Sequence, residues 1–190
     1  MKLLNRALLA PAALTLALAA APALAERADR DQPVNIEANK VTVDDRNKVH
    51  IFEGDVVLTQ GTLVIKGDKL VVTQDAGGFQ NGVATASNPR LATFRQKREG
   101  SNEYVYGEAE RIEYSSRTEK AKLFVRAKVT SGGDEVRGHF IEYDSMSENY
   151  LVTNAPGAAP AATSGGDGRV RAVIQPKSDN KAGGAESAKP

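Results

Sequence analysis

The chain contains no cysteine and no tryptophan, and it has only five phenylalanines and five tyrosines among its 190 residues. The absence of cysteine excludes disulfides, thiol chemistry and zinc–thiolate sites, so burial and backbone hydrogen bonds must hold the fold together. With so few aromatic residues, the interior of any sheet is lined mainly by Val, Ile, Leu and Ala. Their modest volume is compatible with a ligand held between two layers, and also with a dry aliphatic core.

The sequence also lacks an excess of either charge and the residues of a catalytic site. The formal net charge is +1, and it becomes −1 when Lys2 and Arg6 are removed with the leader described below, so a nucleic-acid-binding surface is not expected. The only histidines, His50 and His139, lie far apart without a nucleophile motif or a metal pair beside them. Asp44 and Asp45 fit a turn better than acid–base chemistry. We therefore expect no enzyme activity, no metal site, no cofactor and no nucleic-acid partner.

The first 25 residues are typical of a cleavable secretory signal. Lys2 and Arg6 precede the apolar run ALLAPAALTLALAAAPALA, which ends in Ala-Leu-Ala just before Glu26. A basic start, a short apolar middle and an A-x-A ending indicate export rather than a transmembrane span. The mature chain is expected to begin at Glu26.

From Pro33 to about Val152 the chain alternates apolar and polar residues with the period of β-strands. The segment VVLTQGTLVIKGDKLVVT is an example, and its β-branched runs are broken by Gly61 and Gly67. No window keeps an apolar stripe at helical spacing for three turns. The pattern predicts an all-β, antiparallel protein with short turns.

Two halves of this region repeat each other after a shift of 71 residues, which aligns IKGDKLVV from Ile65 with VRGHFIEY from Val136. The same shift superposes Val41 on Ile112, Phe52 on Leu123, Leu58 on Val129, Gly61 on Gly132, Leu70 on Ile141 and Val72 on Tyr143 without a gap. Two weakly similar multi-strand repeats predict a stack in which each unit buries its apolar face against its neighbours. The shared glycines are expected at bends or close approaches of two backbones.

Several segments resemble the LptA-type, OstA-like family of periplasmic lipopolysaccharide-transport proteins. They are QPVNIEANKVTV from Gln32, FEGDVVLTQGTLVIKGDKLVVT from Phe52, GEAERIEY from Gly107 and VRGHFIEYD from Val136, with GRVRAVIQP from Gly168. The resemblance implies an open antiparallel β-jellyroll whose apolar groove holds the acyl chains of the lipid A part of lipopolysaccharide. It also implies periplasmic localisation and head-to-tail self-association. The implied partners are LptC-like inner-membrane and LptD-like outer-membrane proteins of the same fold, so that the protein forms part of a bridge between the two membranes.

Strand alternation assigns residues to the inner face of this expected groove. The predicted lipid-binding residues are Val34, Ile36, Phe52, Val56, Leu58, Leu63, Ile65, Leu70, Val72, Phe94, Ile112, Tyr114, Leu123, Val129, Val136, Ile141 and Tyr143. Lys66 and Arg137, which precede the repeated glycines, are candidates for phosphate contacts at the rim, or are simply solvated cations. A structural, polymer-forming repeat protein with a dry core and no lipid ligand is the alternative function.

The ends of the chain have a different composition. Residues 26–154 form the expected jellyroll domain, and residues 155–168, rich in Pro, Ala, Gly and Ser, predict a flexible linker. Residues 169–175 read as a final edge strand, and residues 176–190 as a disordered tail. The first and last strands lack internal Pro and Gly, which favours edge-to-edge joining of protomers over a monomer with covered edges.

Overall fold

The computed structural model describes residues 29, 31–77, 80–154 and 170–175. The expected signal peptide, linker and tail lie outside the described residues. Within these ranges, no helix combines the length and the apolar character that crossing a membrane requires.

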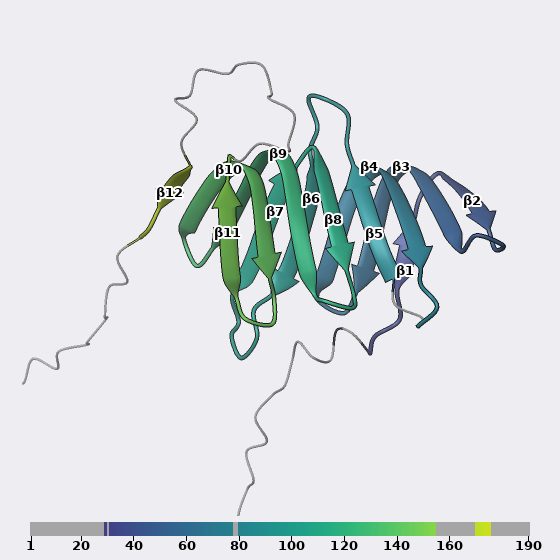
Figure 1. The fold of residues 1–190 in the computed structure, drawn as a ribbon, viewed down its shortest axis with the longest axis horizontal. Coiled ribbons are helices and arrows are strands. Elements are labelled where there is room, and N and C mark those ends of the chain that lie inside the picture. Colours follow the sequence, from purple (N-terminus) through teal and green to yellow (C-terminus); the bar gives the residue numbers. More distant parts are fainter. Residues whose placement is uncertain (1–28, 30, 78–79, 155–169, 176–190) are drawn as a thin grey trace, which may run out of the picture.

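The described elements are twelve strands, arranged as an elongated stack with β1 and β2 at one end and β11 and β12 at the other (Figure 1). Their bounds are β1 Asn35–Glu37, β2 Lys40–Asp44, β3 Val49–Gln60, β4 Leu63–Gln74, β5 Gln80–Thr85, β6 Ala92–Lys97, β7 Tyr104–Ala109, β8 Arg111–Ser115, β9 Lys120–Ser131, β10 Asp134–Asp144, β11 Asn149–Thr153 and β12 Arg171–Val173. All pairings between strands are antiparallel, as predicted.

The four long strands β3, β4, β9 and β10 each take part in two sheets. The sheet that we call the β1–β12 sheet has the order β1, β3, β4, β6, β7, β9, β10, β12. The β2–β11 sheet has the order β2, β3, β4, β5, β8, β9, β10, β11. Each long strand crosses from one sheet to the other at a bend, so all the bends fall on one side of the molecule, which we call the crease.

Unusual backbone conformations mark the crease. Gly54 and Asp55 bend β3 with φ of 84° and 47°, and Val125 and Arg126 bend β9 with φ of 62° and 53°. The pairing register shifts at the bends of β3 and β10. A positive φ is costly for a β-branched residue, so Val125 is held there by the pairing on both sides of the bend. Opposite the crease lies the open side, where the hairpin turns of both sheets meet solvent.

The internal repeat is confirmed strand by strand. A shift of 71 residues maps β2 onto β8 and β3 onto β9 with identical bounds, and it maps β4 onto β10 within one residue. It also preserves register, because Val41 pairs with Phe52 as Ile112 pairs with Leu123. Even the bends coincide, since Gly54 and Asp55 map onto Val125 and Arg126.

The glycines of IKGDKLVV and VRGHFIEY lie where a neighbouring strand comes close, as expected. A Cβ atom on Gly67 would lie 2.8 Å from the carbonyl oxygen of Thr85, and one on Gly138 would lie 2.8 Å from a methyl group of Val152. Both glycines sit at the crease, where β4 and β10 change sheets. The repeated glycine therefore makes room for the strand that follows.

Candidate functional site

The inner faces of the two sheets carry continuous rows of apolar side chains from one end of the molecule to the other. In the β2–β11 sheet, residues that pair directly across the strands are Val41, Phe52, Leu70, Ala84, Ile112, Leu123, Ile141 and Val152. In the β1–β12 sheet they are Ile36, Leu58, Ile65, Phe94, Gly107, Val129, Val136 and Ala172. We call these the two inner rows. Together they line one long apolar interior.

All the residues predicted for the groove belong to this interior or pack against it. Twelve are buried: Val56, Leu58, Leu63, Ile65, Leu70, Val72, Phe94, Ile112, Leu123, Val129, Ile141 and Tyr143. Five are half-buried and pack against that core: Val34, Ile36, Phe52, Tyr114 and Val136. Their inward orientation is confirmed, and lipid contact at these positions stays a prediction. In the middle of the molecule the two sheets pack directly against each other, as in the dry-core alternative.

The interior reaches solvent at the N-terminal end. Val41 and Val43 are 54% and 53% exposed, although Val41 continues the inner row of the β2–β11 sheet. They are exposed because β2 pairs with β3 on one side, and none of the described strands lies on its other side. An aliphatic ligand, or the end of another sheet, can therefore contact these side chains directly.

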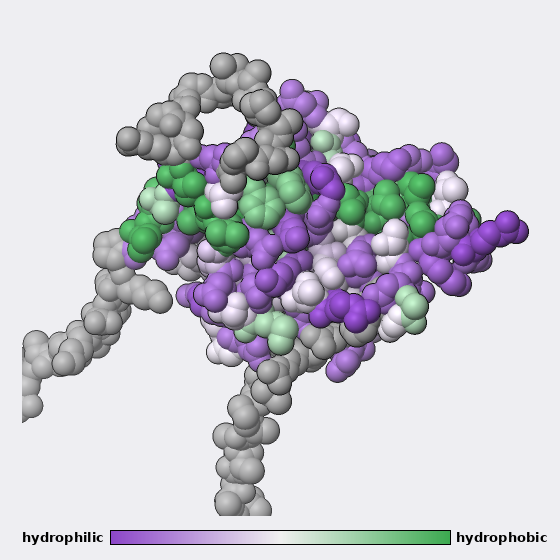
Figure 2. Space-filling model, in the orientation of Figure 1, coloured by the Kyte–Doolittle hydropathy of each residue, from purple (hydrophilic) through white to green (hydrophobic). Residues whose placement is uncertain are grey.

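At the C-terminal end the interior opens into a cavity of about 320 Å³. Its apolar walls include Val129, Val136, Ala172 and Ile174, and its polar lining includes Arg98 and Tyr150. Hydrophilic side chains cover most of the surface in Figure 2, and one cluster of hydrophobic side chains lies over β12, where Val173 and Ile174 are exposed. Both ends of the apolar interior are thus incompletely covered.

Near this cavity, an ion pair joins the two sheets across the open side. Arg98 lies in the turn after β6 and contacts Glu148 in the turn before β11. It also contacts Glu103 at 2.9 Å, and these carboxylates raise the pKa of the guanidinium. Just inside, the rings of Phe94 and Tyr143 pack edge to face across the interior, with centroids 6.0 Å apart. We call the ion pair between Arg98 and Glu148 the clasp. Among the described residues, no ion pair joins β2 to the opposite sheet.

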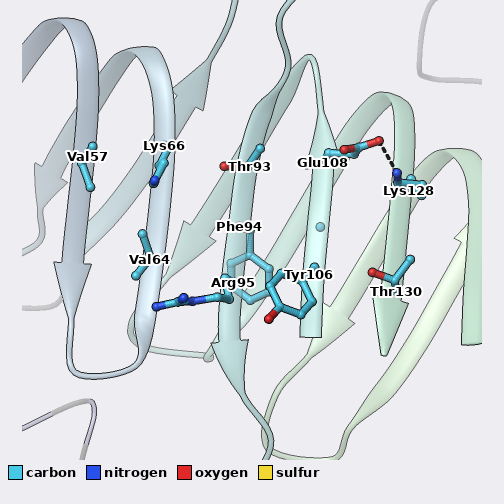
Figure 3. A pocket seen from close by; sticks show the side chains of 11 residues that line it. Val57, Val64, Lys66, Thr93, Phe94, Arg95, Tyr106, Glu108, Lys128 and Thr130 are labelled. Carbon is cyan, nitrogen blue, oxygen red and sulfur yellow. Dashed lines mark ion pairs between the residues drawn. The ribbon is translucent and has the colours of Figure 1, made fainter. Parts of the chain in front are cut away.

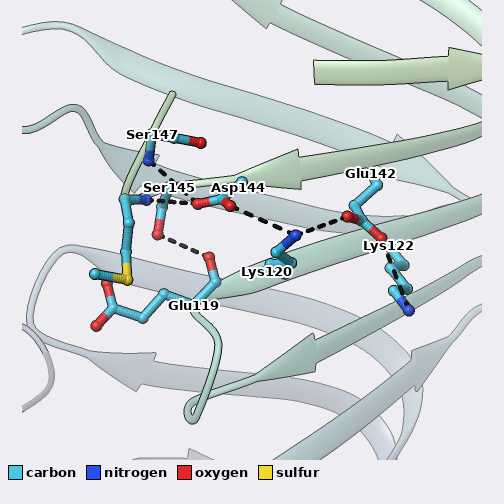
Figure 4. A network of polar contacts seen from close by, with 8 residues as sticks. Glu119, Lys120, Lys122, Glu142, Asp144, Ser145 and Ser147 are labelled. Carbon is cyan, nitrogen blue, oxygen red and sulfur yellow. Dashed lines mark hydrogen bonds and ion pairs between the residues drawn. The ribbon is translucent and has the colours of Figure 1, made fainter. Parts of the chain in front are cut away.

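A polar network holds the turn that carries Glu148 (Figure 4). The Asp144 carboxylate accepts hydrogen bonds from the amides of Met146 and Ser147 at 3.0 and 3.2 Å, and the Ser145 hydroxyl donates to the carbonyl of Glu119 at 2.8 Å. Glu148 itself has a φ of 54°. Such a conformation persists in a non-glycine residue when its surroundings fix it. The network therefore presents the Glu148 side chain in a defined position.

The structure places the two candidate phosphate contacts on the outer surface and not at the open side. Lys66 lines a hollow of about 530 Å³ on the outer face of the β1–β12 sheet, with Arg95 and Tyr106 (Figure 3). Arg137 lies on the outer face as well and pairs with Glu135 at 2.5 Å. The expected position at the rim is wrong for both, because each precedes a crease glycine on the outward-facing side of its strand. Phosphate binding by either residue stays a prediction.

The residues considered for catalysis have structural contacts. The Asp44 carboxylate accepts hydrogen bonds from the backbone amide and side-chain amide of Asn47, at 3.0 and 2.7 Å, which confirms its role in a turn. These bonds lower the pKa of Asp44. His50 lies on β3, and its Nε2 atom is 3.7 Å from Oδ1 of Asp45 in the preceding turn. His139 lies at the crease. The two histidines therefore do not share a site.

Several residues of the interior were missed by the sequence argument. Val41 is the repeat partner of Ile112, and the same shift maps Val43 onto Tyr114; that relation is the signal that assigns both valines to the inner face. The alternation of Gln96 with Phe94 predicts its inward side but not its burial, and the ion pair between Arg98 and Glu148 had no signal. Their contacts depend on how the two sheets face each other, and strand alternation does not contain this information.

Comparison with known proteins identifies the family. A sequence profile described as "LptA/(LptD N-terminal domain) LPS transport protein" matches residues 35–149. The chain belongs to this family. The lipopolysaccharide export system protein LptH of Pseudomonas aeruginosa is 31% identical over 164 residues, covering 86% of this chain and 91% of the relative. LptA of Escherichia coli strain K12 is 33% identical over 129 residues, covering 68% and 69%.

The fold comparison agrees with the sequence comparison. The crystal structure of LptH from P. aeruginosa, described as the LptA-homologous periplasmic component of the conserved lipopolysaccharide transport device, matches with a TM-score of 0.70 and 27% identity. The match covers 78% of this chain and 99% of that chain. The predicted jellyroll of the LptA family is therefore confirmed.

Proposed function

We propose that this protein carries lipopolysaccharide through the periplasm, from the inner to the outer membrane, and that it does so without catalysis. The observation that supports this most directly is the pair of inner rows, which run the whole length of the molecule and are uncovered at both ends. A continuous apolar track suits a ligand with several acyl chains. The names of the relatives supply the ligand class.

Acyl chains enter, on this proposal, by parting the two sheets along the open side. The crease keeps the sheets connected through four bent strands, whereas polar contacts and side-chain packing hold the open side. Each buried methylene stabilises the complex by about 0.8 kcal/mol, so partial enclosure of one chain offsets several kcal/mol of opening. The binding energy is spread over many residues, so no single aliphatic substitution abolishes it.

The same ends serve assembly in this proposal. The N-terminal end presents the edge strands β1 and β2, and the C-terminal end presents β11 and β12. Pairing of one end with the other aligns the inner rows of successive protomers and extends the apolar track. LptC-like and LptD-like proteins of the same fold then take the two terminal positions at the inner and outer membranes.

Binding is tested with the purified chain and lipopolysaccharide in a calorimetric titration. The double variant Val41→Asp/Val43→Asp should fold normally, because both side chains are exposed, and should bind more weakly, because it places charge on the inner face of β2. The matched control, Thr42→Asp, adds a charge to the outward side of the same strand. Failure of the unmodified chain to bind would leave the dry-core structural polymer as the better function, which the close packing of the middle of the interior favours.

Assembly is tested by light scattering over a series of protein concentrations. We expect the average mass to grow with concentration, because a head-to-tail contact does not close on itself. Ile36→Pro removes a backbone donor from β1 and should weaken end-to-end joining while leaving the remaining strands folded. A variant that assembles like the parent protein would argue against joining through this strand.

A further inference from the structure

Gln96 is a polar residue inside an otherwise apolar interior. It lies on β6 with the inward parity of Phe94, is only 4% exposed, and pairs across the sheet with Val105 on β7. The side-chain oxygen Oε1 is buried and accepts no hydrogen bond from any residue that the structure describes. Leaving such an acceptor unmet costs about 1–3 kcal/mol, whereas an apolar residue of similar size would remove that cost. Gln96 therefore lowers the stability of the fold relative to an apolar residue at this position.

A second unmet acceptor belongs to the opposite sheet. One carboxylate oxygen of Glu148 is held by Arg98, while the other, Oε1, is buried and has no partner among the described residues. Arg98 follows Gln96 by two positions, so it lies about 7 Å nearer the open side along the extended chain. Both acceptors therefore belong to neighbours of Arg98, Gln96 along the chain and Glu148 through the ion pair.

The space beside the clasp is suited to a ligand. Arg98 lines the cavity of about 320 Å³, together with Tyr150 and the apolar side chains of Val129 and Val136. Burial raises the pKa of the Tyr150 hydroxyl, so it stays protonated at neutral pH. Gln96 and Glu148 do not line this cavity, but both neighbour Arg98, which does: Gln96 lies two positions before it, and Glu148 forms its ion pair. A cavity with aliphatic walls and a cation, beside two unmet acceptors, matches the polar end of an acyl chain better than a plain hydrocarbon.

We propose that Gln96 and Glu148 form a polar subsite that selects acyl chains bearing a hydroxyl group near their polar end. The inference rests on the proposed function and refines it, because it assigns a chemical preference to the C-terminal half of the groove. The ligand hydroxyl donates to Gln96 Oε1, the head group lies at Arg98, and the hydrocarbon tail follows the inner rows. A site that hydrogen-bonds a hydroxyl discriminates against the chain without it, because the buried acceptor is then left unmet.

The test compares dodecanoic acid with 3-hydroxydodecanoic acid, each displacing a fluorescent fatty acid from the full mature chain. We expect the hydroxylated chain to bind about tenfold more tightly, equivalent to one buried hydrogen bond of about 1.4 kcal/mol. In Gln96→Leu the ratio should fall below about twofold. Binding of plain dodecanoic acid should be kept or improved. Thr93→Val, on the outer side of the same strand, is the matched control and should keep the preference.

Thermal unfolding separates this role from a structural one. If Gln96 serves the ligand, Gln96→Leu and Gln96→Met should melt at the same temperature as the parent protein or higher, because an unmet acceptor is removed. Lower melting temperatures together with an unchanged preference would overturn the assignment.

The outcomes also distinguish the inference from the function on which it rests. Binding of neither fatty acid would contradict the groove itself. Equal binding of both by the unmodified chain would overturn the polar subsite and leave the groove intact, with solvent meeting the acceptor on Gln96.

Discussion

The two copies of the repeat have the same strands and registers but very different exposure. Val41 on β2 and Ile112 on β8 are repeat partners on the inner face, yet Val41 is 54% exposed and Ile112 is 1% exposed. The difference comes from position alone, because β8 lies between β5 and β9 whereas β2 has one neighbour. The sequence pattern thus determines which face a residue takes, and its place in the stack determines whether that face is covered.

This contrast teaches how a repeat protein keeps a joining surface. A repeat in the middle of the stack has its apolar inner face covered by neighbours on both sides and forms a core. A repeat at the end has an apolar row without a neighbour, which another protomer of the same fold can cover. The C-terminal copy also has an ion pair between the two sheets that has no counterpart among the described residues of the N-terminal copy. Glu148, which joins the sheets through Arg98, corresponds to Gly77 after the 71-residue shift. Along the open side, the clasp thus joins the two sheets in the C-terminal half, and the described residues of the N-terminal half show no such ion pair.

The largest expected difference is in the free energy of unfolding that is lost when Ile112 or its repeat partner Val41 is truncated to alanine. Ile112→Ala should lower the free energy of unfolding by about 3 kcal/mol, because it leaves a cavity in the core. Val41→Ala should change it by less than about 0.5 kcal/mol, because the side chain is already hydrated. Urea denaturation of both variants at a concentration where the protein is monomeric measures the difference. Equal costs would contradict the described position of β2.

Substitution of the two crease glycines, Gly67 and Gly138, should have the next largest effect on the free energy of unfolding. Gly67→Ala should cost about 2 kcal/mol, because the new methyl group meets the carbonyl oxygen of Thr85, which the sheet holds in place. Gly138→Ala should cost about half as much, because its nearest neighbour is a methyl group of Val152, which can rotate away. Urea denaturation of the pair gives both values, and the reverse ranking would contradict the close approach at Thr85.

Loss of the clasp should have a smaller effect on global stability. Glu148→Gln should lower the free energy of unfolding by about 1 kcal/mol or less, since both partners of the ion pair are partly solvated. Amide hydrogen exchange should accelerate in β11 and remain unchanged in β2, which no described ion pair joins to the opposite sheet. Uniform acceleration in both halves would show that the pair does not act locally.

The smallest expected effect is on the acid limb, by which we mean the decline in the free energy of unfolding as the pH falls below about 5. Burial acts to raise the pKa of Asp144, but hydrogen bonds from the amides of Ser147 and Met146 and the charge of Lys120 outweigh it, so the pKa is lowered. A lowered pKa in the folded state gives stability above the unfolded value that is lost as the pH falls through the folded value. Asp144→Asn should therefore flatten the decline of stability between about pH 5 and 2.

A carboxylate of the N-terminal copy provides the comparison. Glu53 has a lowered pKa because Lys40 and Lys69 donate hydrogen bonds to it, at 3.0 and 3.2 Å, but its side chain is 37% exposed, against 24% for Asp144. Glu53→Gln should flatten the acid limb less than Asp144→Asn. Thermal melts across the pH range measure both, and a steeper acid limb in either variant would contradict the sign.

Strand alternation and the repeat predicted much of this molecule. They identified the antiparallel fold, the inward set from Ile36 to Tyr143 and the role of Gly67 and Gly138. They did not predict that the long strands bend from one sheet into another, because Val125 and Arg126 have no local signal for a positive φ. They consequently missed the second edge strand at each end and placed Lys66 at the wrong surface.

Long-range packing decides the remaining features. The closure of the interior around Leu123 and Phe94, the burial of Gln96 and the contact from Arg98 to Glu148 all depend on two sheets facing each other. These contacts join residues that are far apart in the chain, so the local sequence pattern does not predict them. The residues predicted to line a groove do face the interior, whereas the packed middle of that interior required the structure.

The most direct test of the account is photo-crosslinking of lipopolysaccharide to the two faces of β2. Val41 and Thr42 are adjacent and exposed, but only Val41 continues the inner row. A photoreactive residue at 41 should capture lipopolysaccharide and one at 42 should capture little, because neighbouring side chains of a strand point to opposite faces. Equal capture at both positions would contradict a lipid-binding groove between the sheets.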